Sequence, residues 1–380
     1  MKNISSIHNC FGCGVCAASC PTQVISIVLN DNGFYESHVI DHNNCKNCGI
    51  CLDVCAFTHK ERALKPDEIQ INSWAAWSND NVVRQKCSSG GIGFEIGKQL
   101  IEMGYKAIGC RYKPDKERAE HFIAIAVEDF EQSIGSKYIQ SFTEDAFKQI
   151  KRNGEKYLVT GTPCQIDSFR LMIRKFHCEE NFILLDFFCH CVPSMYAWKS
   201  YTKMLEKKIG KVTFASWRNK PTGWHDSWTM FLKGVKGIHT SWMSKGDLFY
   251  KLFLGDLILG PQCQKECKYK YDKSSADIRI GDLWGETYKE NQKGVSALIT
   301  FTERGKLIVE NLKNVTIIET PFEVVSEGQM KSNAKAKELA PVFLYALKKG
   351  MKLDGLLFKC LYNTQRVIGR IHQLLNYFIK

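Results

Sequence analysis

The sequence predicts a chain of mixed α+β and α/β class, and three observations support this assignment. A cysteine run occurs twice within residues 1–60, which predicts a small N-terminal domain. Strand-like and helix-like patterns alternate over residues 73–320, which predicts a mixed sheet flanked by helices. Residues 321–380 are mainly helical and basic in pattern, which predicts a helical C-terminal extension.

The two cysteine runs share the spacing C-x2-C-x2-C-x3-C. This spacing is typical of bacterial-ferredoxin 4Fe–4S clusters, in which the fourth Cys of each run ligates the other cluster. One cluster is therefore predicted on Cys10, Cys13, Cys16 and Cys55. The other is predicted on Cys45, Cys48, Cys51 and Cys20. Structural zinc is the alternative, but zinc sites usually separate two C-x2-C pairs by a gap. Ala56 departs from the pattern, because a Pro follows only the first run.

The secondary-structure pattern can be followed along the chain. Residues 24–29 and 34–35 are predicted strands around a tight turn at 31–33, and residues 61–72 are a predicted linker. Thr143 is predicted to cap a helix that starts there. Further strands are predicted at 74–77, 105–112, 121–127, 156–159 and 182–188, with antiparallel strands in 211–242. Further helices are predicted at 88–103, 165–176 and 193–209.

The last part of the chain, residues 353–380, is amphipathic. Its apolar stripe consists of Leu356, Leu357, Cys360, Leu361, Ile368, Ile371, Leu375 and Phe378, with Lys359, Arg366 and Arg370 elsewhere on the helix. Such a stripe usually packs on the protein body, and less often forms an oligomer or membrane-surface contact.

Composition describes an ordinary globular protein with 44% hydrophobic and 24% charged residues. The formal net charge is +12, which bound clusters would reduce. This basicity favours an acidic electron donor or an anionic substrate, and no nucleic-acid motif is present. The first residues have no apolar signal core, and no stretch approaches the ~20 apolar residues of a membrane span. With 17 cysteines, the chain is expected in the reducing cytoplasm, and an oligomer is compatible with it.

A second group of motifs lies in the sheet region. Ser88, Ser89, Gly90 and Gly91 open a predicted helix and offer backbone N–H groups to a phosphate, although an ordinary capped turn explains them equally. Lys137 and Tyr138 add a cation and an aromatic ring. Gly161, Thr162 and Gln165 follow a predicted strand, where open sheets form ligand crevices.

Four further cysteines follow predicted strands or lie in a loop after Gly260. Cys164, Cys189, Cys263 and Cys267 could hold a third 4Fe–4S cluster. Buried thiols that pack as small apolar groups, or a zinc site, are the alternatives.

These motifs, together with Trp217–Trp224 and Asp277–Gly285, resemble the family of coenzyme F-420 hydrogenase and dehydrogenase beta subunits over about residues 1–320. The resemblance implies an FAD-binding catalytic domain at residues 73–320, with the FAD candidates Ser88, Ser89, Gly90, Gly91, Lys137, Tyr138, Gly161, Thr162 and Gln165. It also implies the third cluster on Cys164, Cys189, Cys263 and Cys267. Cys263 and Cys267 are separated by three residues where two are expected. Cys191 stands where a Gly is more usual, so it is either a substitute ligand or an inert thiol.

The family resemblance also implies a function. Members pass electrons between iron–sulfur clusters and FAD, and hydride between FAD and an organic substrate. Candidate acid–base residues are His190, His225 and Asp282, although a lone His is more often structural. The expected partners are ferredoxin or a redox partner subunit, together with a small-molecule substrate. The alternative is an electron-relay subunit of a larger redox complex that turns over no substrate itself.

Overall fold

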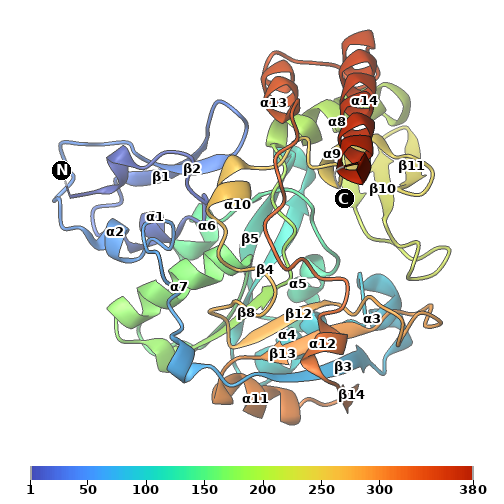
Figure 1. Cartoon of the computed structure of the whole chain (residues 1–380). Helices are drawn as coiled ribbons and strands as arrows, with labels where there is room; N and C mark the ends of the chain where they lie inside the picture. The colour runs from blue at the N-terminus through green and yellow to red at the C-terminus, as the bar shows by residue number, and fades with distance from the viewer. Residues whose placement is uncertain (1, 379–380) are drawn as a thin grey trace.

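The computed structural model describes residues 2–378, which form three β-sheets and the helices around them (Figure 1). The N-terminal part is a small module of two helices and a hairpin. It contains α1 (Val15–Ser19), β1 (Ile25–Leu29), β2 (Tyr35–Val39) and α2 (Ile50–Asp53). Gly14 and Gly49 precede the two helices with φ of 78° and 79°, so both cysteine runs enter their helix through the same left-handed turn.

The central sheet has nine strands in the order β14-β3-β13-β12-β8-β7-β4-β5-β6. These are β3 (Asn72–Ser78), β4 (Lys106–Lys113), β5 (Arg118–Ala124), β6 (Ser141–Phe142), β7 (Tyr157–Thr160), β8 (Phe182–Phe187), β12 (Ile278–Asp282), β13 (Ser296–Thr300) and β14 (Val315–Glu319). The four adjacent strands β4, β7, β8 and β12 are parallel, whereas β13 pairs antiparallel with β12 and with β3. The carboxyl ends of the parallel strands therefore meet at one edge of the sheet.

The helices of the chain lie around this sheet, and several of them cover its two faces. They are α3 (Asn81–Lys86), α4 (Ile92–Glu102), α5 (Val127–Phe130), α6 (Glu144–Phe147), α7 (Pro163–Lys175), α8 (Met195–Ile209), α9 (Leu248–Phe253), α10 (Pro261–Lys265), α11 (Glu303–Glu310), α12 (Phe322–Val325), α13 (Ala340–Lys348) and α14 (Leu356–Phe378). Leu158 of β7 packs in the core under α4 and α11, whereas the next residue, Val159, packs in the core under α6 and α7. This alternation is the period of a strand that is buried on both sides.

The N-terminal module shares the core under α7. Val15 and Val54 of the module are fully buried in the same apolar cluster as Phe169 of α7. The module and α7 are therefore packed as neighbours (Figure 1).

A separate three-stranded antiparallel sheet of β9 (Val212–Ser216), β10 (Thr229–Gly234) and β11 (Gly237–Trp242) lies against α8.

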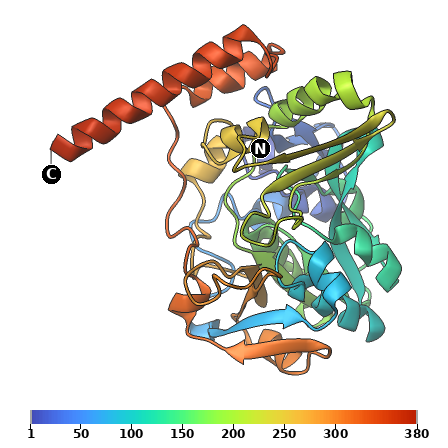
Figure 2. The ribbon, with the colours of Figure 1, turned by 90° about the vertical axis from the view of Figure 1, so that its right-hand side faces the viewer.

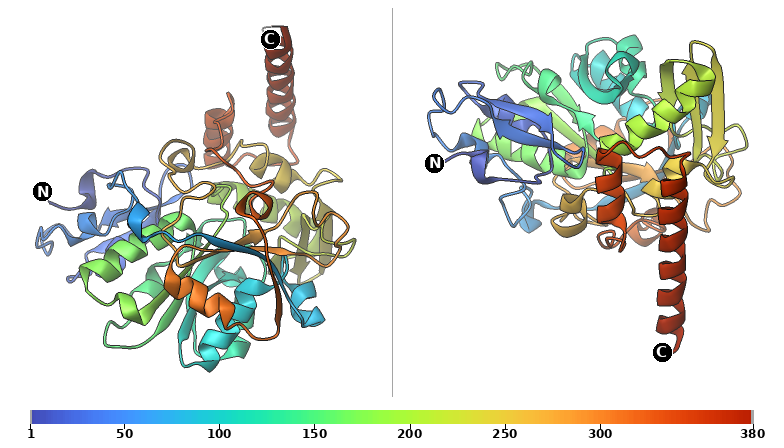
Figure 3. Two further views of the ribbon diagram at one scale, coloured as in Figure 1. Left: turned by 60° about the horizontal axis from the view of Figure 1, so that its bottom comes forward. Right: turned by 90° about the horizontal axis from the view of Figure 1, so that it is seen from above.

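The C-terminal residues form two helices beyond the sheet. α13 packs on α8, Phe358 of α14 contacts Phe343 of α13, and the rest of α14 extends away from the sheet region (Figures 2 and 3). No helix within residues 2–378 has the length and apolarity needed to cross a membrane.

The predicted fold class is confirmed, and most predicted elements are present with ends shifted by up to four residues. Two local predictions differ from the structure. The hydroxyl of Thr143 does not cap α6 but donates to the carbonyl of Cys13, at 2.9 Å. The predicted linker is held in place, because Ala63 and Leu64 are buried and their N–H groups donate to Asp167 and Ser275.

Candidate iron–sulfur and cofactor site

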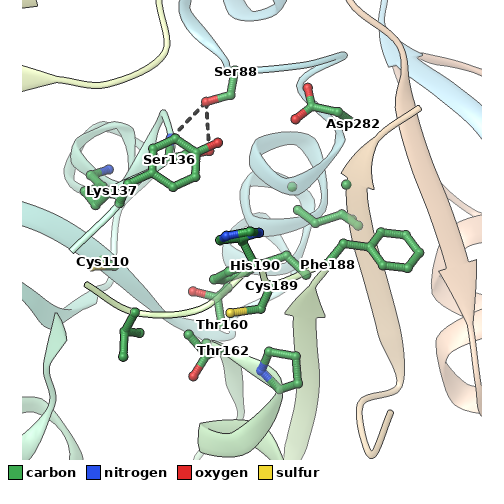
Figure 4. A pocket seen from close by; sticks show the side chains of 18 of the residues that line it. Ser88, Cys110, Ser136, Lys137, Thr160, Thr162, Phe188, Cys189, His190 and Asp282 are labelled. Atoms are coloured by element: carbon green, nitrogen blue, oxygen red, sulfur yellow. Dashed lines mark hydrogen bonds between the residues drawn. The ribbon is translucent and has the colours of Figure 1, made fainter. Parts of the chain in front are cut away.

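A cavity of about 450 Å³ lies where the carboxyl ends of β7, β8 and β12 meet the turn that precedes α4. Its wall includes all of the FAD candidates except Gly90, and all four third-cluster cysteines. In Figure 4, His190 is drawn between the Ser88 end and the Cys189 end of the cavity. The topology thus brings together motifs that are separated by up to 180 residues in the chain, at the edge where α/β sheets bind their ligands.

The turn at residues 88–91 is fixed from several sides. The Ser88 hydroxyl accepts hydrogen bonds from the backbone N–H and the hydroxyl of Ser136, at 2.9 and 3.1 Å (Figure 4). The Ser89 hydroxyl donates to the Val295 carbonyl at 2.7 Å. Gly91 has φ of 90° and begins α4. The turn therefore presents backbone to the cavity, while its hydroxyls hold it to neighbouring loops.

Gly90 has a different position from the one predicted. Its N–H donates to the Ser296 hydroxyl, and a Cβ at this residue would lie 2.5 Å from the Ala76 carbonyl oxygen of β3. Gly90 is therefore required for close packing on the sheet, and it does not line the cavity.

Buried cations surround the turn, and the sequence reasoning missed two of them. The ammonium of Lys220 donates to the carbonyls of Ser89 and Lys293, at 2.9 and 2.7 Å. The guanidinium of Arg84 donates to the Gly294 carbonyl, at 2.9 and 2.6 Å. Neither side chain pairs with a carboxylate among the described residues. Both were hidden because only the folded chain brings them to the turn.

Lys137 has the same character as Lys220. Its ammonium donates to the carbonyls of Gln132, Ser133 and Ile134, and it lines the cavity. Burial lowers the pKa of Lys137 and of Lys220 to about 8. A protonated lysine in this setting is uncompensated, so the site would stabilise an anion such as a diphosphate.

Tyr138 and Asp282 are both tied to Arg218, which is fully buried. The guanidinium of Arg218 binds both oxygens of the Asp282 carboxylate, at 2.9 and 3.1 Å, and donates to the Tyr138 hydroxyl at 3.1 Å. Trp224 also donates to Asp282, at 3.0 Å. Because Arg218 and Trp224 occupy its carboxylate oxygens, Asp282 fits the role of a fixed hydrogen-bond acceptor better than that of an acid or base.

The two histidine candidates are in different positions. His190 lines the cavity, and its Nε2 lies 3.0 Å from an oxygen of Asp256. His225 packs against Trp224 with the two rings tilted by 51° and their centroids 4.9 Å apart, and it is not part of the cavity wall. Of the two, only His190 could contact a molecule in the cavity.

The first predicted cluster has its thiols together. Burial raises the pKa of the Cys13 thiol to about 12, and the neighbouring thiols of Cys55 and Cys10 add to that rise. Burial also raises the pKa of Cys16, with Cys13, Cys10 and Cys55 as further causes. The thiols that approach one another are thus those of Cys10, Cys13, Cys16 and Cys55. The backbone N–H of Gly12 donates to Cys10 Sγ at 3.4 Å, a bond of the kind that tunes cluster potentials.

The second predicted cluster lies nearer the surface. Burial raises the pKa of Cys51, and the thiols of Cys48 and Cys20 add to it. Asn3 donates to Cys45 Sγ at 3.4 Å. The crossed pairing, in which the fourth Cys of each run joins the other run, therefore agrees with the arrangement of the thiols.

The third predicted cluster also has converging thiols. Burial raises the pKa of Cys164, and Cys263, Cys189 and Cys13 add to that rise. Cys267 contributes likewise to the raised pKa of Cys189, after burial and together with Cys263. The pKa of Cys263 is raised first by a hydrogen bond with Cys191. Five thiols therefore gather here, one more than a cluster needs.

These thiol groups are wider than a single-ion site. Among residues 2–378, no three Cys, His, Asp or Glu side chains converge closely enough to hold one metal ion. A tetrahedral zinc site would place each sulfur about 2.3 Å from one ion. A cluster of four irons instead accepts one thiolate at each iron, so its ligands can be further apart.

Family comparison identifies both halves of this arrangement. Residues 9–58 match the model of the 4Fe-4S dicluster domain, and residues 154–323 match the model that describes the C terminus of the coenzyme F420 hydrogenase/dehydrogenase beta subunit. The second match includes all four third-cluster cysteines. Over residues 154–323 the chain is similar to the coenzyme F420 hydrogenase/dehydrogenase beta subunits. The predicted resemblance and the predicted 4Fe–4S module are confirmed, and the family is one of oxidoreductases.

Relatives within this family are distant in sequence. The F subunit of F(420)H(2) dehydrogenase from Methanosarcina mazei is 25% identical over 190 residues, which cover 47% of this chain and 53% of the relative. The chain thus spans about half the length of the curated relative that it matches. A chain of the F420-reducing NiFe hydrogenase complex from Methanosarcina barkeri aligns with a TM-score of 0.45 and 17% identity, over 77% of this chain and 91% of that chain.

Proposed function

We propose that this protein is an FAD-dependent iron–sulfur oxidoreductase. In this proposal electrons pass between the 4Fe–4S clusters of residues 1–60 and FAD in the domain of residues 73–320, and hydride passes between FAD and an organic acceptor or donor. When bound, the clusters would exchange single electrons, and a flavin would exchange one or two. The predicted extension at residues 321–380 is only partly outside this machinery, because α12 packs on the sheet and Gly328, Gln329 and Met330 line the cavity.

The observation that carries the proposal is the shared cavity wall. Ser88, Lys137 and Gly161 from the flavin motifs line the same cavity as Cys164 and Cys189. Its volume of about 450 Å³ is within the usual range for cofactor pockets, about 300–1,000 Å³. A flavin bound here would lie beside the third group of thiols.

The buried cations support the same orientation of the cofactor. Lys220 and Arg84 lie behind the Ser88 end of the cavity wall, where they bind backbone carbonyls around the turn, and backbone N–H groups at the start of α4 also favour negative charge there. The FAD diphosphate would bind at this end. The ring system would then lie toward His190 and Cys189, where the wall includes Phe188 and Phe253.

Packing of the module on α7 supports a route for electrons. Cys13 lies 3.3 Å from the Ser168 hydroxyl, and Ser168 is one helical turn after Cys164 on α7. The first predicted cluster is thus adjacent to the third, and the third is adjacent to the cavity. The second cluster, on the exposed side of the module, is the proposed entry point for electrons from ferredoxin or a partner subunit.

Coenzyme F420 is the first substrate to test, because it occurs in the names of the matched family and of the curated relative. His190 is the proposed proton donor or acceptor in the cavity, with Asp256 orienting its ring. We place the protein in the reducing cytoplasm, where the unpaired thiols of the described chain would persist.

The test begins with protein purified without oxygen. About 12 irons per chain, matching sulfide and one FAD are expected, because each cluster contributes four irons. Chemically reduced ferredoxin should then reduce the flavin, and F420 should be reduced or its reduced form oxidised. Absence of flavin after reconstitution with FAD would reject the proposal.

The relay alternative makes a different prediction in the same experiment. A relay subunit would bind clusters and exchange electrons with a partner, but would turn over no F420 or other hydride acceptor. One observation supports this alternative. The chain covers only 53% of the curated relative, and that relative is itself named as a subunit.

A further inference from the structure

The long C-terminal helix α14 has an apolar face that nothing in the described chain covers. Leu356, Val367, Ile371, Leu374 and Leu375 are 77%, 55%, 49%, 58% and 52% exposed. At 23 residues, α14 is roughly 35 Å long and extends clear of the body (Figures 2 and 3). This exposure is unusual, because an apolar stripe on a helix is normally buried against another element.

The body-facing side of α14 is a different side. Phe358 and Gln365 are buried, and Gln365 accepts a hydrogen bond from the Leu339 N–H at 3.0 Å. These two residues are seven apart, so they share one stripe along the helix. Val367 and Ile371 are placed by their spacing on another stripe. Packing on the body therefore does not account for the exposed apolar face.

The charges along α14 have one sign. Residues 356–378 contain no Asp or Glu. Lys359, Arg366 and Arg370 are spaced by seven and four residues, which places them in one row beside the apolar face. All three are exposed.

The region that leads into α14 is also basic. Residues 331–378 contain nine Lys or Arg but only two acidic residues, Glu338 and Asp354. Both acidic side chains are already paired, Glu338 with His372 at 3.0 Å and Asp354 with Lys207 at 2.7 Å. No carboxylate of this segment remains to balance the row of cations on α14.

We propose that α14 binds the surface of an anionic phospholipid membrane, with its apolar face in the acyl boundary and its cationic row at the phosphates. A helix with one apolar face and a cationic flank is suited to lie in the membrane interface. Pairing of α14 with a second copy would instead bring together two helices that have cations and no acidic side chain. An anionic lipid surface supplies the opposite charge, which favours it over self-association. This inference is independent of the redox proposal.

The experiment is vesicle co-sedimentation of the full-length protein with its clusters. Vesicles of phosphatidylcholine are compared with vesicles that also contain about 30 mol% phosphatidylglycerol. The wild-type protein should bind the anionic vesicles, and raising salt from about 0.1 M to about 0.5 M should release most of it. Equal binding to neutral vesicles, or none to either, would overturn the proposal.

Variants separate the apolar and the cationic contributions. Ile371→Glu should weaken vesicle binding at least about tenfold, because it puts a charge on the face of α14 that is proposed to enter the acyl boundary. The double variant Arg366→Gln/Arg370→Gln should weaken it about 10- to 30-fold, through two lost cationic contacts. The control is Ile125→Glu, which changes a side chain that is 68% exposed and lies away from α14, and should bind as the wild type does.

Two further readouts protect the conclusion. Visible cluster absorbance, unchanged in every variant, shows that the body remains folded. Sedimentation velocity reports the oligomeric state. A wild-type dimer that Ile371→Glu dissociates, without vesicle binding by the wild type, would assign the apolar face to a second copy and reject the membrane.

Discussion

The thiol of Cys13 lies 3.3 Å from the hydroxyl of Ser168, a contact that joins the N-terminal module to helix α7. The same hydroxyl accepts a hydrogen bond from the Ala56 N–H at 3.0 Å. Since Cys164 is four residues before Ser168 on α7, one buried side chain links the cysteine runs to the cavity wall. The position of Ser168 gives the first prediction.

Ser168→Ala should lower the reduction potential of the cluster predicted on Cys13, because a hydroxyl that donates to a thiolate stabilises the more negative, reduced state. The expected shift is about 20–60 mV, the one-electron equivalent of a hydrogen bond of about 0.5–1.5 kcal/mol. Redox titration followed by electron paramagnetic resonance measures it. Ser200→Ala on α8, which removes a hydroxyl bonded to the Met351 carbonyl, is the control. An unchanged potential would show that Ser168 only anchors the module.

The third cluster is tested by counting irons. Cys164→Ser or Cys263→Ser should reduce the content from about 12 to about 8 irons per chain, because loss of one ligand removes a four-iron unit. Electron transfer from reduced ferredoxin to bound flavin should then slow greatly. Cys178→Ser changes a buried thiol that bonds only to the Ile173 carbonyl, and it should leave about 12 irons. Eight irons in the wild-type protein, with fast flavin reduction, would contradict the third cluster.

The same measurement assigns Cys191. Its hydrogen bond with Cys263 makes it a candidate substitute ligand. If the four predicted cysteines are the ligands, Cys191→Ser should retain about 12 irons. If Cys191→Ser falls to about 8 irons per chain and Cys267→Ser keeps about 12, Cys191 is the cluster ligand in place of Cys267.

Lys220 is predicted to favour the flavin diphosphate by its buried charge, while its ammonium holds the turn through the carbonyls of Arg84, Ser89 and Lys293. Lys220→Met should weaken FAD binding roughly 10- to 100-fold, which corresponds to about 1.5–3 kcal/mol, because it removes this charge and the hydrogen bonds that fix the turn. Equilibrium dialysis of FAD measures this loss. Lys293→Met is the control, because its ammonium reaches only the Asn81 side chain at the surface. Equal FAD affinity in both variants would show that the diphosphate does not bind near Lys220.

The affinity for flavin should also depend on pH through the protonation of Lys220. Burial lowers the pKa of Lys220 to about 8 in the free protein, and a bound diphosphate would raise it. Binding then takes up a proton, so affinity should fall as pH rises above 8. The stability of the flavin-free protein should depend on pH in the opposite direction. The pKa of Lys220 in the folded chain is below the unfolded value of 10.5, so the unfolded chain binds more protons. The free energy of unfolding should therefore rise between pH 8 and 10.5. Lys220→Met should reduce both pH dependences without abolishing them, because Lys137 also has a lowered pKa of about 8.

Much of this arrangement could be predicted from the sequence because it depends on local spacing. The pairing of Cys55 with the first run follows from a repeat within 50 residues, and the position of Cys164 follows from its place directly after a strand. Tertiary contacts decided the rest. Arg218 holds Asp282 from 64 residues away, and Gly90 faces the Ala76 carbonyl, which no local pattern indicates. Lys220 lies within the Trp217–Trp224 motif, but its contact with the turn at residues 88–91 is seen only in the folded chain.

His190 gives the last prediction, because it is the histidine candidate whose ring faces the cavity. If it moves a proton during hydride transfer, His190→Gln should lower that rate about 10²- to 10⁴-fold while iron and flavin contents stay unchanged. Asp256 lies 3.0 Å from Nε2, so Asp256→Asn should give a smaller loss and shift the pH profile, as expected for a residue that orients the ring. His225→Gln is the matched control. His225 packs against Trp224 outside the cavity wall, so this variant should keep nearly full activity. Stopped-flow measurement of flavin oxidation by the acceptor separates this step from cluster reduction. If His225→Gln is slow and His190→Gln is not, the hydride acceptor binds on the Trp224 side, and His190 is a structural partner of Asp256.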